Sequence, residues 1–355
     1  MNSPLKRIES AWGFLRAQDA FRRAPLLTLF RSATWYWRCL LRMATTLELP
    51  RWNVRMFFPA QRKGFGKFIF AFFEYYEPEL AYLEKVLSPG KIFIDVGANF
   101  GVYTLVASKL AGAAGRVIAI EPTAQSFAIL RQNIALNHFA NVRAFQVALT
   151  QTRGKAWLYH GWDPVGNSLG MDPLRGDEGE EVQTESLDTL LEENSIDGVD
   201  VIKVDVEGAE ELVLRGATRT LITNSPVVIF EFNPGCAARL GLSPDGARDF
   251  LQGLGYEFVI LDDSANCKNP AQRPTYFNII AIPKQWAGEI SRSFHSLPGQ
   301  PQVPRRGSSI GLNVQGTRYR TRSEMPDGTK LPDISRDTSA TVGLREIARH
   351  KGHAG

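Results

Sequence analysis

Apolar residues recur along the middle of the chain in two alternating patterns. Short runs of β-branched and aromatic residues, at 92–94 and 117–120, are typical of buried strands in a parallel sheet. Between them, residues 102–110 place apolar side chains on one helical face, and Gly112 and Gly115 end that helix. A strand, a helix and a second strand in this order form a βαβ unit, so the pattern predicts an α/β fold.

The turn that follows the first strand predicts a bound ligand. Asp95 comes at the end of the strand, and Gly97 and Gly101 let the backbone turn tightly, while Asn99 tolerates left-handed geometry. Glu121 ends the second strand, where a carboxylate can accept hydrogen bonds from both hydroxyls of a ribose. With an acid at each strand end, an adenosine cofactor explains this layout better than an ordinary connection does.

Departures from the dinucleotide pattern narrow the choice of cofactor. The second and third glycines of that pattern admit pyrophosphate and pack the helix, but Asn99 and Val102 stand at those positions here. Nor is there a P-loop at Gly66-Lys67, because Phe68 replaces the Ser or Thr that holds magnesium and Gln61 replaces the first glycine. A cofactor without phosphates fits the turn better, which favours S-adenosylmethionine over NAD.

Five segments carry a pattern that extends beyond this turn. They are residues 94–104 (IDVGANFGVYT), 120–122 (IEP), 130–133 (LRQN), 186–191 (SLDTLL) and 202–210 (IKVDVEGAE). Together they resemble the FkbM family of S-adenosylmethionine-dependent methyltransferases, over a span from about residue 76 to residue 283. The resemblance implies a class I methyltransferase (Rossmann-like) fold, a mostly parallel sheet with an antiparallel terminal strand and helices on both faces. It also implies O-methylation of a hydroxyl on a saccharide or natural product.

The resemblance assigns cofactor-binding roles residue by residue. Four positions of the turn lie around the methionine half of the cofactor: Asp95, Gly97, Asn99 and Gly101. Glu121 binds the ribose, and Thr104 also matches the motif, although a Thr one turn into a helix can equally cap or pack. The end of the third strand, with Gln146 and Ala148, supplies the adenine contacts.

Acidic residues near two later strand ends are candidates for catalysis. Residues two apart in a strand share a face, so Lys203, Asp205 and Glu207 are expected to project together. Glu231 and Asn233 share a face in the same way at the end of the next strand. Asp205 is the leading candidate for the base that removes the acceptor proton, with Glu207 and Glu231 as alternatives.

Three alternatives accompany this catalytic assignment. Glu207 can instead cap the helix that begins near residue 209. His160 is a rival base, because it precedes the segment 161–170, which reads either as an acceptor lid or as an ordinary surface loop. The acids also resemble a loose set of Mg²⁺ ligands, so a catechol-type, metal-assisted mechanism is a second interpretation; no dedicated metal cage is predicted.

Charge is distributed unevenly along the 355 residues. Residues 1–62 carry a net charge of +8 and residues 287–355 a net charge of +5, which leaves −9 between them. An acidic body disfavours a nucleic-acid substrate, so we expect a small-molecule or glycan acceptor. The three cysteines, Cys39, Cys236 and Cys267, have no metal-ligand spacing and cannot all pair, which favours a reducing, cytoplasmic location.

The chain divides into three expected parts. Residues 1–75 form a basic, aromatic-rich helical extension, residues 76–286 the methyltransferase domain, and residues 287–355 a tail whose composition predicts disorder. In the extension, an apolar stripe recurs at helical spacing: Leu26, Phe30, Ala33, Trp37 and Leu40. We expect this stripe to pack on the catalytic domain or in a dimer, and the alternative is peripheral contact of residues 26–43 with an anionic membrane. Arginines interrupt the apolar runs too often for a membrane span or a signal peptide.

Two classes of function remain on these grounds. The first is an O-methyltransferase, and the second is a catalytically silent adenosine-ligand-binding or scaffold protein of the same fold. The carboxylates Asp205, Glu207 and Glu231 favour the enzyme, since a binding module has no need of several acids beside the cofactor.

Overall fold

The computed structural model describes residues 12, 13, 15, 16, 19–62, 64, 66–72, 78–161, 166–172, 177–261 and 277–286. These residues belong to one compact unit, residues 1–300. Within them, no helix combines the length and apolarity that crossing a membrane requires. The tail predicted at 287–355 lies outside the described residues.

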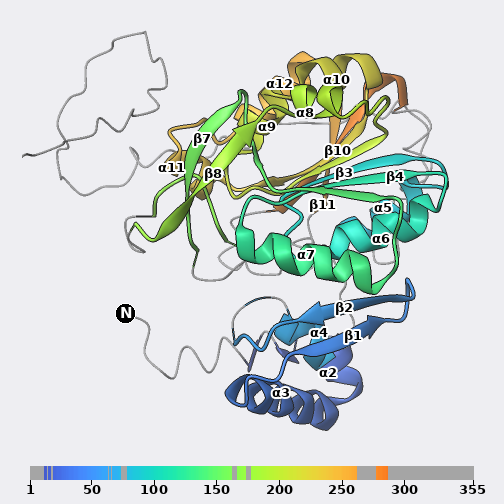
Figure 1. Cartoon of the computed structure of the whole chain (residues 1–355), viewed down its shortest axis with the longest axis vertical. Coiled ribbons are helices and arrows are strands. Elements are labelled where there is room, and N and C mark those ends of the chain that lie inside the picture. Colours follow the sequence, from blue (N-terminus) through green and yellow to red (C-terminus); the bar gives the residue numbers. More distant parts are fainter. Residues whose placement is uncertain are drawn as a thin grey trace, which may run out of the picture. The chain divides into compact units, whose positions relative to one another are not determined.

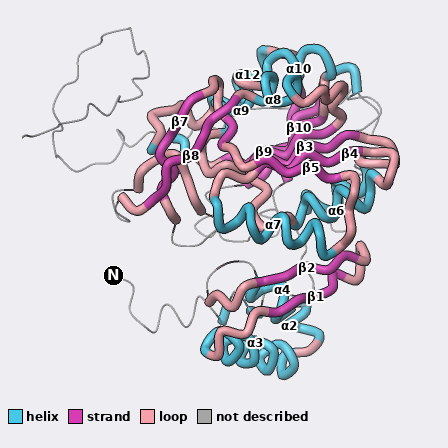
Figure 2. Tube along the Cα trace, in the orientation of Figure 1, coloured by secondary structure: helices cyan, strands magenta, loops and turns pink. Residues whose placement is uncertain are grey.

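A seven-stranded sheet forms the centre of this unit (Figure 2). Its strands, in spatial order, are β11 (Tyr256–Leu261), β12 (Phe277–Pro283), β10 (Val227–Phe232), β9 (Val201–Val204), β3 (Ile92–Val96), β4 (Arg116–Ile120) and β5 (Val142–Phe145). Neighbours from β10 to β5 pair in parallel, and β12 pairs antiparallel to both β10 and β11. This order, with the last strand of the chain inserted antiparallel, confirms the predicted class I methyltransferase fold.

Helices cover both faces of the central sheet (Figure 1). One face carries α5 (Pro78–Val86), α6 (Val102–Ala111) and α7 (Ala124–Leu136); the other carries α8 (Leu187–Glu193), α9 (Glu210–Arg215), α10 (Thr218–Asn224) and α12 (Gly246–Gly253). Successive side chains of β3 point to opposite faces of the sheet, and each face has its own apolar core. Phe93 packs with α6 in one core, and Ile94 packs with α8 and α9 in the other. Helix α11 (Pro234–Arg239) follows β10.

A second, smaller sheet lies next in the chain after β5. It has the order β6-β8-β7, from strands β6 (Ala148–Leu149), β7 (Gly154–Tyr159) and β8 (Gly179–Glu185). The strand β8 therefore belongs to this small sheet and not to the central one. Ala148, Leu158 and Val182 form its apolar core.

The amino-terminal region is not helical throughout. It contains α2 (Asp19–Arg23), α3 (Pro25–Leu40), an antiparallel hairpin of β1 (Thr45–Leu49) and β2 (Val54–Phe58), and α4 (Gly66–Phe72). Two asparagines of α7 hold the hairpin: Asn133 Oδ1 accepts from the Phe57 N–H at 2.6 Å, and Asn137 Oδ1 accepts from the Arg55 N–H at 2.7 Å. The buried Asn133 also donates to the Phe100 carbonyl, 2.8 Å away, so it ties the hairpin to the glycine turn.

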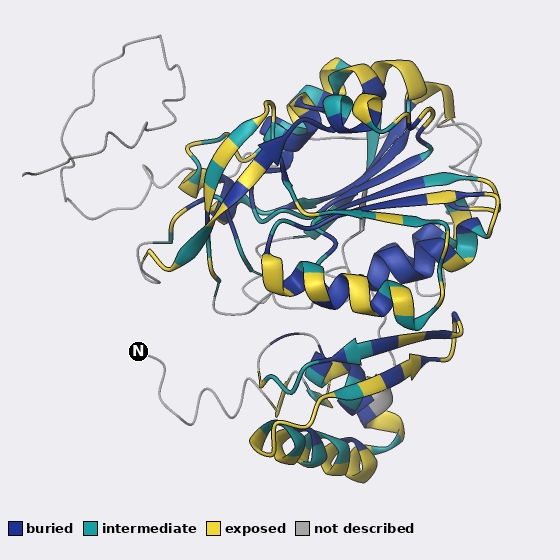
Figure 3. Ribbon diagram, viewed as in Figure 1, coloured by how far each residue is buried: buried dark blue, intermediate teal, exposed yellow. Residues whose placement is uncertain are grey.

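Helix α3 confirms the predicted helix but not its predicted packing. Its inward residues are Thr28 and Trp35, which are buried, whereas Leu26, Phe30 and Trp37 of the predicted stripe are exposed (Figure 3). The expectation that this stripe packs on the catalytic domain is therefore wrong. The helix rotates its apolar stripe outward because Trp35 anchors the opposite side, where its Nε1 donates to the Gln61 carbonyl at 3.2 Å.

Candidate active site

A pocket opens at the carboxyl ends of β3, β4 and β9. It is partly open to solvent. Five of the residues singled out in the sequence line it: Gly97, Asn99, Glu121, Asp205 and Glu207. Strand β3 lies between β4 and β9, so the pocket lies at the point where the strand order reverses, which is where open α/β sheets bind ligands.

Gly97 allows the turn after β3 to touch the loop after β9. Its φ is +80°, and a Cβ there would lie 1.9 Å from the carbonyl oxygen of Asp205. No side chain fits between these two backbone segments. Gly101 also has a left-handed φ of +95° and immediately precedes α6, while Asn99, with φ +49°, completes the turn.

Glu121 is buried and held by the turn. Its Oε2 accepts from the Asn99 N–H at 2.9 Å, and its Oε1 accepts from both the N–H and the hydroxyl of Thr123. Burial raises the pKa of Glu121, and these hydrogen bonds oppose the rise. The side chain is thus oriented toward the pocket before any ligand is present.

Asp95 lies beneath the turn and not in the pocket wall. The Thr104 hydroxyl donates to Asp95 Oδ2 at 2.6 Å, and both side chains are buried. Asp95 Oδ1 has no hydrogen-bond partner among the described residues. Burial raises the pKa of Asp95, and the positive charge of Lys203 opposes the rise.

The predicted adenine contacts lie partly elsewhere. Gln146 is exposed after β5 and is not among the residues that line the pocket. Its neighbours Val147 and Ala148 do line it, together with Leu149. The apolar side chains of this edge supply a surface on which a flat ring can pack.

Lys203 is a buried cation at the centre of the sheet. Its Nζ lies 2.9 Å from Asp205 Oδ2 and 4.4 Å from the centroid of the Tyr103 ring. It is paired across the sheet with Asp95 in the β3–β9 register. Lys203 therefore compensates acids on two strands, and the aromatic ring of α6 adds a cation–π contact.

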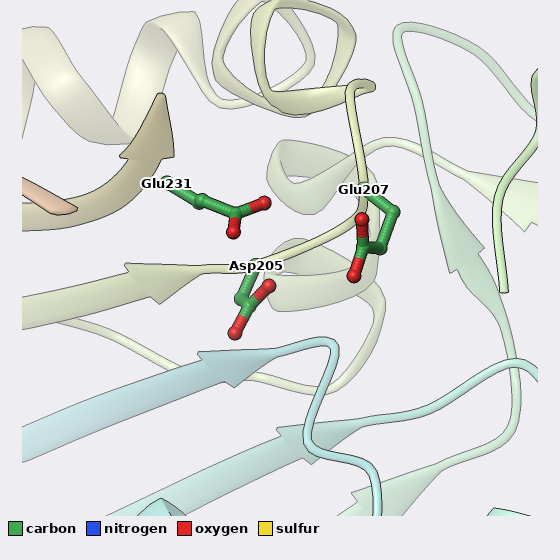
Figure 4. A group of neighbouring side chains, drawn as sticks. All are labelled: Asp205, Glu207 and Glu231. Carbon is green, nitrogen blue, oxygen red and sulfur yellow. The ribbon is translucent and has the colours of Figure 1, made fainter. Parts of the chain in front are cut away.

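Asp205, Glu207 and Glu231 form the acid cluster of the site. Each offers a carboxylate oxygen, and these oxygens lie within 4.8 Å of one another. Figure 4 shows the three carboxylates turned toward one another from the ends of two strands. They do not meet by strand alternation as predicted: β9 ends at Val204, and Glu207 has a left-handed φ of +52°.

The surroundings of Glu231 disfavour its ionised form. Burial raises its pKa to about 9, and the charges of Asp205, Glu207 and Glu210 contribute to the rise. Asn233 Nδ2 lies 3.3 Å from Glu231 Oε2 and 3.4 Å from Glu207 Oε2, so it bridges the two carboxylates. The raised pKa favours the protonated form of Glu231, which limits repulsion within the acid cluster.

Glu210, and not Glu207, holds the loop that enters α9. Its Oε1 accepts from the N–H groups of Val206 and Gly208, each at 3.2 Å. The Glu207 side chain contacts Asn233 Nδ2 and Cys236 Sγ, and its predicted role as a cap of this helix stays a prediction. Burial raises the pKa of Glu210 to about 7. Its position in the first turn of α9 was a sequence signal for this role.

The segment after β7 contributes to the pocket. Asn167 and Leu169 line it, and the Ser168 hydroxyl donates to the Glu207 carbonyl at 2.7 Å. His160 does not line the pocket; its Nε2 lies 3.3 Å from Glu180 Oε1. Trp162 and Asp163, which also belong to the predicted lid, lie outside the described residues.

The groups that line the pocket determine the chemistry it can support. The glycine turn and Glu121 offer backbone and carboxylate groups suited to an amino-acid nucleoside, and the acid cluster offers a base. The same three carboxylates are oxygen ligands of the kind that hard cations take. Within the described residues, no other group of His, Cys, Asp and Glu comes together in this way.

Comparison with known proteins agrees with this geometry. Residues 95–258 match the methyltransferase FkbM domain, which confirms the family resemblance. The 31-O-demethyl-FK506 methyltransferase FkbM of Streptomyces tacrolimicus is 31% identical over 159 residues, which cover 37% of this chain and 60% of that protein. The AMB antimetabolite synthetase AmbE of Pseudomonas aeruginosa is 25% identical over 258 residues, covering 61% of this chain and 12% of that protein.

The likeness to solved structures is weaker. The methyltransferase FkbM of Methylobacillus flagellatus matches with a TM-score of 0.37 and 14% identity, over 61% of this chain and 52% of that one. The chain thus spans 60% or less of the length of each of these three proteins.

Proposed function

Because residues 95–258 form a methyltransferase FkbM domain, we propose that the chain is an S-adenosylmethionine-dependent O-methyltransferase. The acceptor we propose is a hydroxyl group of a saccharide or a natural product. One observation carries the proposal: a single pocket is lined both by the glycine turn with Glu121 and by Asp205 with Glu207. A binding module would need only the first set.

The residues around the turn fit the cofactor. Asp95 is buried beneath the turn, where it accepts from the Thr104 hydroxyl and supports the loop that the cofactor would contact. Gly97 and Asn99 would hold the methionine half, and Glu121 the ribose. When bound, S-adenosylmethionine supplies an electrophilic methyl group for direct displacement by an acceptor oxygen.

Asp205 is the base in this proposal. It lies at the pocket, and its carboxylate is 41% exposed, so it can reach an acceptor hydroxyl. Lys203 holds Asp205 Oδ2 and leaves Oδ1 to take the acceptor proton. Glu231 is the weaker candidate for this role, because burial and the neighbouring acids raise its pKa and favour its protonated form.

Calorimetry and methylation analysis test the proposal together. We expect the protein to bind S-adenosylhomocysteine and not NAD; binding of NAD alone would overturn the assignment. Asp205→Asn should keep that affinity yet lower methyl transfer by about 10²- to 10⁴-fold, the usual contribution of a general base. Asp197→Asn, at an exposed position, is the matched control.

The acceptor is identified by mass spectrometry of glycans and metabolites from cells with and without the gene. A methyl group that disappears with the gene, and that Asp205→Asn does not restore, supports the enzyme. If Asp205→Asn restores it as well as the wild type does, Asp205 is not the base. If no methyl group changes and the protein still binds S-adenosylhomocysteine, the silent ligand-binding protein becomes the better description.

The acid cluster favours one alternative mechanism. Three carboxylates within 4.8 Å could hold Mg²⁺ and orient the acceptor oxygen, as in catechol-type enzymes. Activity that is lost on chelation and regained with Mg²⁺ would select this mechanism. Activity that is indifferent to the chelator would select Asp205 acting without a metal.

A further inference from the structure

The outward side of α3 is apolar along its whole length. We call this surface the apolar face of α3; its members are Leu26, Phe30, Ala33, Trp37, Leu40 and Leu41, the last at the end of the helix. Leu26 is 82% exposed, Phe30 69% and Trp37 63%. Scattered exposed apolar residues are normal, but a contiguous stripe of this kind marks an interaction site.

The orientation of α3 is fixed from the inward side. Trp35 is 2% exposed and donates a hydrogen bond to the Gln61 carbonyl. The Gly66 Cα in α4 approaches it so closely that an added Cβ would lie 3.3 Å from the Trp35 ring. The hydroxyls of Thr28 and Ser32 donate to the carbonyls four residues earlier, those of Ala24 and Thr28. Rotation of the helix to hide the apolar face would therefore expose Trp35.

The surroundings of this face are strongly basic. Five arginines lie between residues 20 and 47, and no acidic residue does. They are Arg22, Arg23, Arg31, Arg38 and Arg42. The first 62 residues carry a net charge of +8, in contrast with −9 for residues 63–286. Arg31 and Arg38 lie nearer the Trp35 side of α3 and are half-buried, whereas Arg22, Arg23 and Arg42 lie near the two ends of the helix and are exposed. An apolar face with large aromatic residues on a basic segment is the composition of a helix that lies in a membrane interface.

We propose that α3 docks the protein on an anionic membrane surface, with the helix in the plane of the interface. Anionic lipid head groups complement the net charge of +8 in residues 1–62, and the acyl boundary receives Leu26, Phe30 and Trp37. A second copy of the chain is the poorer partner. A two-fold interface would bring together two segments that carry the same net positive charge.

Vesicle flotation with the full chain tests the proposal. We expect recovery with vesicles of phosphatidylcholine and phosphatidylglycerol, loss of that recovery at high salt, and little recovery with phosphatidylcholine alone. The double variant Phe30→Ser, Trp37→Ser should bind at least roughly 100-fold more weakly, since it removes two large side chains from the apolar phase. Ile222→Ser, at a 60% exposed position on α10, is the matched control and should bind as the wild type does.

The same samples distinguish the rival occupants. Thermal unfolding, together with binding of S-adenosylhomocysteine at the pocket, which α3 does not line, confirms that each variant is folded. Equal flotation of the double variant and the wild type, or no flotation of the wild type, would overturn the proposal. A dimer in light scattering that the double variant abolishes, without any flotation, would assign the face to a second copy instead.

Discussion

The active site buries charged side chains, whereas helix α3 exposes large apolar ones. Both are exceptions to the usual rule that apolar residues are buried and charged residues are exposed. Around the pocket, Asp95, Lys203 and Glu210 are charged residues that are at most 4% exposed. On α3, Phe30 and Trp37 are large apolar residues that are more than 60% exposed. Each departure costs stability, because buried charges lose hydration and exposed apolar groups lose burial.

The two regions differ in how that cost is compensated. Buried charges of the site are matched inside the protein, by the Lys203–Asp205 contact and by backbone N–H groups on Glu210. The apolar face of α3 has no such match within the described residues. Buried charges that are paired within the protein indicate a site that is already assembled. An exposed apolar face without a partner in the protein indicates a surface that binds something outside the chain.

The largest expected effect is the difference in stability between alanine variants of two tryptophans in the same helix. Trp35→Ala should lower the free energy of unfolding by about 3–5 kcal/mol, because Trp35 is buried. Trp37→Ala should change it by less than about 0.5 kcal/mol, because Trp37 is exposed. Urea unfolding of both variants measures the difference. Similar losses would mean that the apolar face is covered within the protein itself.

Next in size is the effect of removing the buried cation. Lys203→Met should cost about 2–4 kcal/mol, since it leaves Asp95 and Asp205 without their counter-charge. Lys91→Met removes a more exposed pair, with Asp200 at 2.6 Å, and should cost about 1 kcal/mol or less. The measurement is again urea unfolding. Equal costs would show that the charges of the site are not held inside the protein as described.

A smaller effect isolates the contact between the two loops. Gly90 and Gly97 both have a left-handed φ, near +90° and +80°, but only Gly97 meets backbone atoms when a Cβ is added. Alanine at either position carries the cost of that φ, about 1–2 kcal/mol. Gly97→Ala should cost about 1–3 kcal/mol more, because the loops must separate. If thermal unfolding finds no difference, the loops do not rest on each other.

The smallest effect for a step of one pH unit is a dependence of stability on pH that originates in the acid cluster. The folded-state pKa of Glu231 lies above its ordinary value, so its protonation favours folding. That stabilisation is complete below the ordinary pKa and is lost as the pH rises toward about 9. Wild-type stability should therefore fall across this range, with a slope of at most about 1.4 kcal/mol per pH unit from this group.

Glu231→Gln tests the origin of that slope, since glutamine cannot ionise. Calorimetric unfolding at several pH values should show a shallower decline for this variant than for the wild type. Glu48→Gln, at an exposed position on β1, should keep the wild-type slope. An unchanged slope in Glu231→Gln would remove Glu231 as its source.

Sequence pattern predicted the elements that depend on local order. The βαβ unit from β3 to β4 and the strand Tyr256–Leu261 lie where periodicity placed them. The β1–β2 hairpin escaped prediction, because it is held by Asn133, 76 positions away from Phe57 in the chain. A contact of that range leaves no trace in a local window.

For the candidate site, residue types were more predictable than their arrangement. Gly97, Asn99, Glu121, Asp205 and Glu207 all line one pocket, as motif positions suggested. The left-handed turn at Glu207 was not predictable, because a continuous strand would also place Asp205 and Glu207 on one face. The same limit applies to α3, where periodicity identified a stripe but could not say which side Trp35 would anchor.

The contact of Gly97 with the Asp205 carbonyl has a consequence for how such enzymes diversify. Under the proposed chemistry, backbone atoms alone set the spacing between the methyl donor and the base. The opposite wall, with Leu158, Asn167 and Leu169, comes from the small sheet and its following loop. Mutations in that wall can select a new acceptor while the reacting geometry is inherited unchanged.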